Sequence, residues 1–204
     1  AYELLEPTEV ASRIEASVLR GLTRFVGREK EMATLKEAFD KARSGSGQVV
    51  CIVGEAGVGK SRLLLELRRT IPQEEYTYLE GQCLHYGSSM PYLPLLDILR
   101  SYFGLKEGER EFLVRKRLEE KTSAIDPKLK AILPPLQELL SLKVEDEAYL
   151  KLEPQKKREK IFEAIRDLAV VGSQRKPLMV AIDDFQWTDR TSEEFLTYFI
   201  GHLP

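Results

Sequence analysis

The sequence predicts an α/β fold in which a parallel sheet is flanked by helices and carries a large helical insertion. Two short apolar runs, Gln48–Val53 and Leu178–Ile182, are typical of strands that are covered on both faces. A glycine-rich turn and a leucine-rich helical segment follow the first run. The chain from Cys83 to Gly172 is largely helical, and at roughly ninety residues it is far longer than the usual connection between neighbouring elements.

Composition limits the classes of protein to consider. The 204 residues are enough for one large domain, and the net charge of −2 shows no global basic bias towards nucleic acid. The two cysteines, Cys51 and Cys83, fit reduced thiols, and no apolar run reaches the length of a membrane span. We therefore expect a cytoplasmic protein without a membrane partner. The chain starts at Ala1 and stops at Pro204 directly after an apolar helical segment, which predicts a fragment of a longer protein.

The first part of the chain divides into a linker and the start of a domain. Residues 1–22 hold scattered apolar side chains and predict a linker with a short helix over Glu9–Arg20. We take 23–204 as the domain, with the helical insertion at 83–173. Its first segment, Phe25–Glu29, leads into a helix that runs to Ala42, and spacing alone favours a simple turn there.

A complete phosphate-loop pattern follows the first predicted strand. Its glycines allow positive φ and bring backbone N–H groups against an anion, and the helix that begins near Gly59 adds the positive end of its dipole. Lys60 would reach the β and γ phosphates, and the Ser61 hydroxyl would be one ligand of Mg²⁺. The alternative is a glycine-rich turn that binds nothing. The predicted nucleotide-binding residues of this stretch are Gly54, Glu55, Ala56, Gly57, Val58, Gly59, Lys60, Ser61 and Arg62.

Two adjacent carboxylates, Asp183 and Asp184, end the second apolar run. Carboxylates at the end of a buried strand are costly unless a charged group lies beside them, and Mg²⁺ is the natural candidate. Asp183 would hold the cation, directly or through water, and Asp184 would act as general base towards the attacking water. The alternative is a solvated turn that caps the next helix. Beyond it, Thr191–Glu194 matches a capping box for a helix that runs through Ile200.

The remaining elements are a short strand and the helices of the insertion. Tyr76–Glu80 predicts a strand that is closed by Gly81. Lys156, Lys157, Arg158 and Lys160 form a basic cluster in the insertion, but interleaved glutamates favour a solvated face with i,i+4 pairs over a specific ligand. The predicted helices of the insertion are Tyr92–Phe103, Glu109–Lys121, Pro127–Leu140 and Gln155–Val171.

Four stretches together resemble the STAND class of AAA-like P-loop ATPases, specifically the module that follows class III adenylate or guanylate cyclase domains in bacterial proteins. The resemblance implies that backbone at Val26 and Gly27, with Arg28 close by, helps to hold the adenine base. It also implies that Tyr2–Ser17 leads out of a cyclase domain. The stretches are FVGREKEMATL from Phe25, VVCIVGEAGVGKSRLL from Val49, EGQCLHYGSSMPYLPLLDIL from Glu80 and MVAIDDFQWTDRTSEEFL from Met179.

The resemblance also implies elements that this sequence lacks. Members of the class continue into a strand with a polar sensor residue, a further strand, a winged helix and often helical repeats. That sensor strand lies between the phosphate-loop strand and the strand that ends in the Asp pair. We therefore expect a truncated sheet with unpaired edges, and hence weak stability or self-association. No arginine finger can be assigned, so hydrolysis should be slow.

The predicted function is Mg-ATP binding and slow hydrolysis in a regulatory module of a larger signal-transduction protein, linked to a nucleotide cyclase. ATP, ADP and Mg²⁺ are the expected ligands. The expected partners are other domains of the same polypeptide, with a cyclase-like domain before the module and a winged-helix or repeat domain after it. Two alternatives stay open: a switch that responds to ATP occupancy without significant turnover, and a DNA-linked ATPase of the initiator type.

Overall fold

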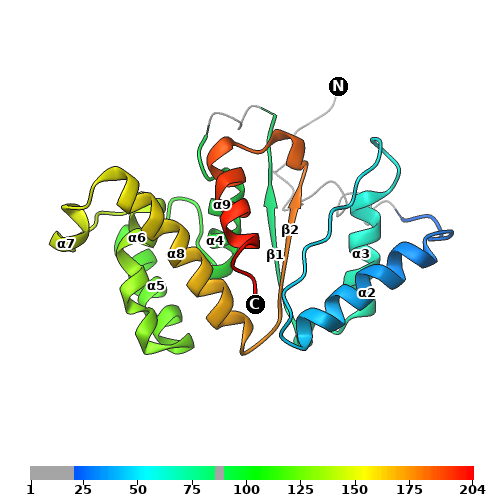
Figure 1. Cartoon of the computed structure of the whole chain (residues 1–204), viewed down its shortest axis with the longest axis horizontal. Coiled ribbons are helices and arrows are strands. Elements are labelled where there is room, and N and C mark those ends of the chain that lie inside the picture. The colour runs from blue at the N-terminus through cyan, green and yellow to red at the C-terminus, as the bar shows by residue number, and fades with distance from the viewer. Residues whose placement is uncertain (1–20, 86–89) are drawn as a thin grey trace, which may run out of the picture. The chain divides into compact units, whose positions relative to one another are not determined.

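The computed structural model describes residues 21–85 and 90–204, so the predicted linker helix at Glu9–Arg20 lies outside the described residues. The chain divides into two compact units, which we describe separately (Figure 1). The smaller unit contains Val49–Pro72 and the described part of Ala1–Asp40. The larger unit contains Lys41–Gln48 and Gln73–Pro204.

Two amphipathic helices give the smaller unit its structure. Helix α2, Glu29–Arg43, begins directly after the Gly-Arg pair and buries Leu35 and Phe39 on one face. Helix α3, Lys60–Thr70, buries Leu63 and Leu67. In both helices the buried pair is four residues apart, the spacing that places side chains on the same face. The helix that was predicted to run to Ala42 is confirmed, and Leu35 and Phe39 form its buried face.

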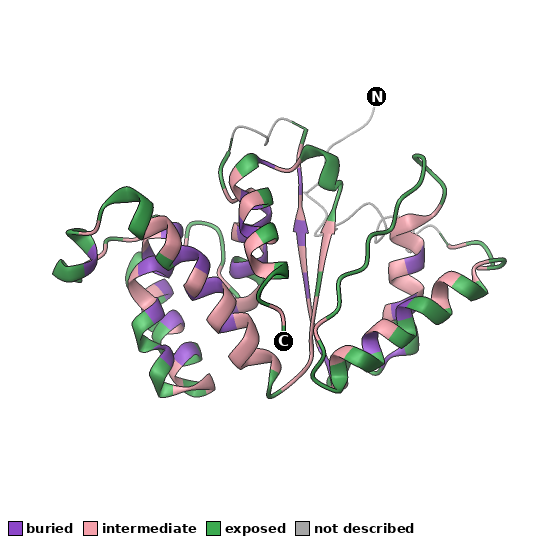
Figure 2. Cartoon of the chain, in the orientation of Figure 1, coloured by how far each residue is buried: buried purple, intermediate pink, exposed green. Residues whose placement is uncertain are grey.

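The predicted strand at Gln48–Val53 is wrong. The structure has no strand there, and the valines of this segment are exposed, Val49 by 52% and Val53 by 91% (Figure 2). Cys51 is exposed as well and is a free thiol. A strand needs a neighbour that supplies hydrogen bonds to its backbone. Among the described residues the only sheet is the pair β1–β2, which does not include this segment.

The larger unit contains that sheet, which is parallel. Strand β1, Thr77–Gln82, pairs in register with β2, Leu178–Asp183, so that Gln82 lies opposite Asp183. The strand predictions near these positions and the prediction of a parallel sheet are confirmed for this pair. The expectation that Leu178–Ile182 is covered on both faces is wrong, since no residue of β2 is buried and Val180 is 43% exposed. Gly81 lies within β1 and not after it. Helix α4, Leu93–Phe103, passes closely there, since a Cβ at Gly81 would lie 2.5 Å from the Pro94 carbonyl oxygen.

Helix α4 packs on β1, and the helices of the larger unit form its hydrophobic core, whose buried stretches are purple in Figure 2. Phe103, Leu99, Leu118 and Leu136 are among the largest fully buried side chains and come from three helices of the predicted insertion. All four helical stretches predicted for the insertion contain helix, with ends shifted by a few residues. The elements of this unit, besides the strands, are η1 Gln73–Glu75, α4 Leu93–Phe103, α5 Glu111–Ile125, η3 Pro127–Ile132, α6 Leu133–Leu139, α7 Glu147–Leu150, α8 Pro154–Ser173, η4 Phe185–Trp187 and α9 Arg190–Ile200.

Within the described ranges, none of the helices combines the length and the apolar character that crossing a bilayer requires.

Candidate nucleotide-binding site

The phosphate-loop residues form a turn that runs directly into α3. Gly57 and Gly59 have φ values of 81° and 93°, a backbone conformation that side-chain-bearing residues rarely adopt. Gly54 is constrained differently, since a Cβ there would lie 2.9 Å from a methyl group of Val58. Helix α3 then begins at Lys60, with Gly59 as its N-cap. Each of the three glycines is therefore required by the local geometry. Gly57 and Gly59 are required by their positive φ, and Gly54 by the lack of room for a side chain beside Val58.

The Lys60 side chain folds back over the loop that precedes it. Its ammonium donates hydrogen bonds to the carbonyl oxygens of Gly54, at 2.9 Å, and Glu55, at 3.0 Å. A lysine ammonium has a further donor beyond these two bonds. The Lys60 ammonium thus lies against the loop backbone, at a position where it would contact an anion bound in the turn.

Arg28 connects the Gly-Arg-Glu segment to the phosphate loop. Its guanidinium donates to the Val58 carbonyl oxygen at 3.2 Å and pairs with Glu31 at 2.7 Å. Within the same segment Gly27 has a φ of 73°, and its N–H donates to a Glu29 carboxylate oxygen at 3.3 Å. The Gly-Arg-Glu segment is therefore in direct contact with the phosphate loop, although α2 separates the two in sequence.

Arg62 does not extend towards the phosphate loop, although it follows the motif directly. Its Nε donates to Glu66 at 2.7 Å, one helical turn along α3, and its Nη2 donates to the Thr23 carbonyl oxygen at 3.1 Å. The guanidinium also lies 5.9 Å from the centroid of the Phe25 ring. The sequence predicts Arg62 as a nucleotide-binding residue, and that role stays a prediction. These contacts instead direct it to the segment before α2.

The Asp pair lies at the end of β2 in the larger unit, where the chain turns into η4. Asp184 has a φ of 53°, a left-handed conformation that aspartate tolerates better than most residues. Its N–H donates to Asp183 Oδ1 at 2.9 Å, and its own Oδ1 accepts from Gln186 at 3.0 Å. Both carboxylates are exposed. Trp187 follows Asp184 by three residues, and its ring centroid lies 4.2 Å from that of His85, which follows β1.

Asp189 is the residue that sequence reasoning undervalued. The predicted capping box at Thr191–Glu194 is wrong, because the N-cap of α9 is Asp189, whose carboxylate accepts from the Ser192 N–H at 2.9 Å and from its hydroxyl at 2.6 Å. The same carboxylate accepts from the Tyr92 N–H at 3.2 Å, across the start of α4. Asp189 is only 4% exposed. It therefore fixes the chain that follows the Asp pair to the first helix of the insertion.

Replacing Asp189 with alanine should lower the free energy of unfolding by about 1 to 3 kcal/mol, because it removes a helix cap and leaves buried N–H donors without an acceptor. Urea denaturation followed by circular dichroism would measure this. Asp126→Ala is a matched control, since Asp126 caps η3 through one exposed bond to the Lys128 N–H at 2.7 Å. Equal losses in the two variants would contradict the special role of Asp189.

The donor set of the smaller unit fits the phosphates of a nucleotide. Helix α3 has no acidic residue in its first turn and a glycine at its N-cap, so its N-terminal dipole and N–H groups favour an anion. A serine hydroxyl and a carboxylate are hard oxygen ligands of the kind that Mg²⁺ prefers. Ser61 belongs to the smaller unit and Asp183 to the larger, and the joint magnesium site stays a prediction.

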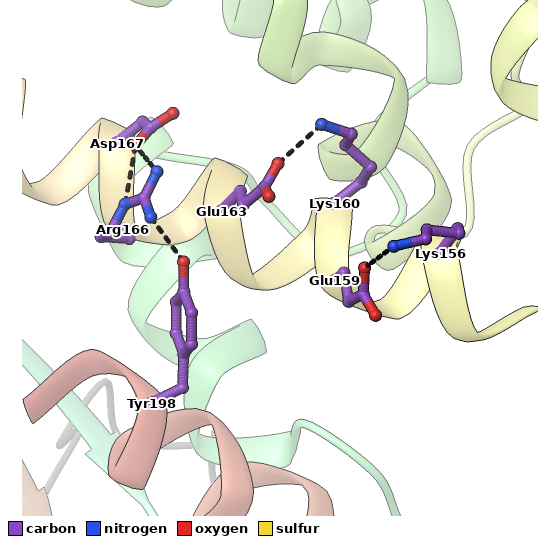
Figure 3. Close-up of polar contacts among 7 residues, drawn as sticks. All are labelled: Lys156, Glu159, Lys160, Glu163, Arg166, Asp167 and Tyr198. Atoms are coloured by element: carbon purple, nitrogen blue, oxygen red, sulfur yellow. Dashed lines mark hydrogen bonds and ion pairs between the residues drawn. The ribbon is translucent and has the colours of Figure 1, made fainter. Parts of the chain in front are cut away.

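The basic cluster of α8 is paired with carboxylates. Lys156 pairs with Glu159 at 2.6 Å and Lys160 with Glu163 at 2.7 Å, both along the same helix (Figure 3). The other two members of the cluster pair with residues on other helices, Lys157 with Glu138 and Arg158 with Glu194. Further along α8, Arg166 donates to the Tyr198 hydroxyl of α9 at 2.6 Å (Figure 3). The predicted ion pairing along α8 is confirmed, but the two pairs are spaced i,i+3 and not i,i+4 as expected.

An uncharacterized protein of Rhizobium meliloti (strain 1021) is 30% identical over 174 residues, which is 84% of this chain and 16% of that protein. The chain thus spans about a sixth of the length of this relative. No solved structure matches the chain. The model of the family described as AAA ATPase domain matches residues 24–204, nearly the whole chain. The chain therefore belongs to the AAA ATPase domain family and is an ATP-binding ATPase module of that family.

Proposed function

We propose that this module binds Mg-ATP, hydrolyses it slowly and acts as a regulatory switch in a larger signal-transduction protein linked to a nucleotide cyclase. The observation that carries this proposal is the phosphate loop. Its left-handed glycines lead into the N-terminus of α3, and its lysine ammonium lies against the loop backbone. The family membership of the chain supports ATP as the nucleotide.

In this proposal the phosphate loop binds the phosphates and the Gly-Arg-Glu segment holds the base. The residues from Gly54 to Ser61 would surround the α and β phosphates with N–H donors, and Lys60 would contact the β and γ phosphates. Backbone at Val26 and Gly27 would lie against the adenine. The contact between Arg28 and Val58 supports this arrangement, because it joins the two segments directly.

The catalytic step would be in-line attack of water on the γ phosphate, giving ADP and phosphate. Ser61 and Asp183 would hold Mg²⁺, which would neutralise charge on the phosphate oxygens. Asp184 would accept the proton of the attacking water. No arginine finger is assigned among the residues of this chain, and such a group is worth about 10³ to 10⁵ in rate, so turnover should be low.

The wider assignment concerns the parts of the polypeptide on either side of the module. We take 1–22 as a linker, 23–204 as the nucleotide-binding domain and 83–173 as its helical insertion. The module matches only 16% of the length of its relative, which supports a role as one part of a larger protein. A cyclase-like domain before it and a winged-helix or repeat domain after it would be the partners through which nucleotide state is transmitted.

Calorimetric titration of the chain with ATP, with and without Mg²⁺, tests binding directly. Single-turnover assays with labelled ATP then separate slow hydrolysis from an occupancy switch, because a switch alone would release no phosphate. A mobility-shift assay at several salt concentrations tests the DNA-linked alternative. The ion pairs of the α8 cluster predict no shift at physiological salt. Absence of measurable ATP binding by the wild-type chain would refute the proposed function.

We also expect the chain to self-associate as its concentration rises. The sheet of the described residues pairs β2 on one edge only, and the apolar segment at Gln48–Val53 is exposed. Open strand edges and exposed apolar runs favour pairing with another chain. Sedimentation velocity at several concentrations would show a rising average mass. A monomer that melts sharply at every concentration would contradict this expectation.

A further inference from the structure

A short segment before α2 is held at both ends by arginines. At one end Arg62 donates to the Thr23 carbonyl oxygen at 3.1 Å, and at the other Arg28 donates to the Val58 carbonyl oxygen at 3.2 Å. Between these contacts lie Arg24, Phe25, Val26 and Gly27, of which Val26 is 65% exposed. The segment is therefore tied to α3 on one side and to the phosphate loop on the other, and the Val26 side chain is left open between the two ties.

Arg62 is built as a structural clamp. Its side chain is 17% exposed and that of its partner Glu66 is 18% exposed, so the ion pair is largely shielded from water. Charged hydrogen bonds of this kind are stronger than exposed ones. The planar guanidinium donates to Glu66 and to Thr23 together while it lies over the Phe25 ring. A lysine could not reproduce this fork geometry.

We propose that Arg62 is a positioning residue that fixes the base-side segment Thr23–Arg28, and that it governs recognition of the nucleoside part of the ligand and not of the phosphates. This inference rests on the proposed function, in which that segment holds the adenine. Because the side chain is engaged with Thr23, Phe25 and Glu66, it does not serve as a phosphate ligand. Its loss would release the segment while the phosphate loop keeps its glycines and Lys60.

The two parts of the ligand can be separated experimentally by titrating the full chain with Mg-ATP and with inorganic tripolyphosphate plus Mg²⁺. The wild-type chain should bind both, and ATP more tightly. Arg62→Ala should weaken ATP binding by about tenfold or more, the size expected for a lost charged hydrogen bond, and leave tripolyphosphate binding unchanged. Arg62→Lys should recover only part of the ATP affinity. Glu66→Gln should also weaken ATP binding, but by less than Arg62→Ala does.

Arg69→Ala is the matched control. Arg69 also pairs with Glu66, at 3.1 Å, but it is 46% exposed and its described contacts do not include the Thr23–Phe25 segment. This variant should bind both ligands as the wild type does. Thermal melting of each variant reports whether the fold is retained.

Several results would overturn the proposal. Equal losses for ATP and tripolyphosphate in Arg62→Ala would make Arg62 a phosphate ligand or a residue of general stability. Unchanged binding of both ligands would show that the clamp has no effect, and full recovery by Arg62→Lys would show that charge alone matters. A wild-type chain that binds tripolyphosphate but gains nothing from the nucleoside would also reject the clamp. A wild-type chain that binds neither ligand would instead refute the proposed function on which the clamp depends.

Discussion

Replacing Lys60 with alanine should abolish measurable Mg-ATP binding while the fold stays intact. Loss of one partner from a close charge pair costs about 2 to 5 kcal/mol, which lowers affinity by one to several orders of magnitude. The structure indicates why folding should be spared. The ammonium contacts the carbonyl oxygens of Gly54 and Glu55 in an exposed loop, and water can replace it at both. Isothermal titration calorimetry would measure the loss, and circular dichroism would verify the fold.

Lys36→Ala provides the control for this experiment. Lys36 lies on the exposed face of α2 in the same unit, so the variant removes an equal charge without touching the phosphate loop. It should bind ATP as the wild type does. Wild-type affinity in Lys60→Ala would refute the phosphate-loop assignment. Equal losses of affinity in both variants would mean that the effect comes from the change in net charge and not from a contact of Lys60 with phosphate.

Local patterns predicted the described helices and the glycine-rich turn before α3 well, since their hydrogen bonds and turns form between near neighbours in sequence. Helix α4 shows the limit of that accuracy. It was expected to begin at Tyr92 but begins at Leu93, because Tyr92 has a φ of 66° and donates its N–H to Asp189. A partner 97 positions away in sequence decides where this helix starts. Boundary shifts of this kind follow from contacts that periodicity does not encode.

The failures share the same origin. Gln48–Val53 has the β-branched composition of a strand, but a strand forms only where a neighbour pairs with its backbone. Thr191 and Glu194 match a capping box, yet Asp189 begins the helix because its carboxylate also serves Tyr92. Neither the lack of a pairing strand among the described residues nor the contact between Asp189 and Tyr92 is encoded in the local pattern. Arg62 likewise donates to Thr23, 39 residues earlier in the chain, and its contact with a nucleotide stays a prediction.

Replacing Asp184 with asparagine should leave Mg-ATP binding in place and slow hydrolysis by about 10²- to 10⁴-fold, the contribution expected of a general base. Asparagine suits this test for two structural reasons. It tolerates the left-handed conformation at φ 53°, and its carbonyl oxygen can still accept the hydrogen bond from Gln186. The variant therefore keeps the turn and removes the proton acceptor together with its negative charge. Single-turnover phosphate release would measure the rate.

Asp183→Asn should weaken the binding of Mg²⁺ and leave proton transfer from the attacking water to Asp184 unchanged. Its carbonyl oxygen can still accept from the Asp184 N–H, so the turn after β2 is kept, but the negative charge that would attract Mg²⁺ is lost. We expect the difference in ATP affinity with and without Mg²⁺ to shrink in this variant and to stay at its wild-type value in Asp184→Asn. The two carboxylates are adjacent and exposed, so nothing in burial distinguishes them. Identical behaviour of the two variants would thus reject the division of roles between metal ligand and base.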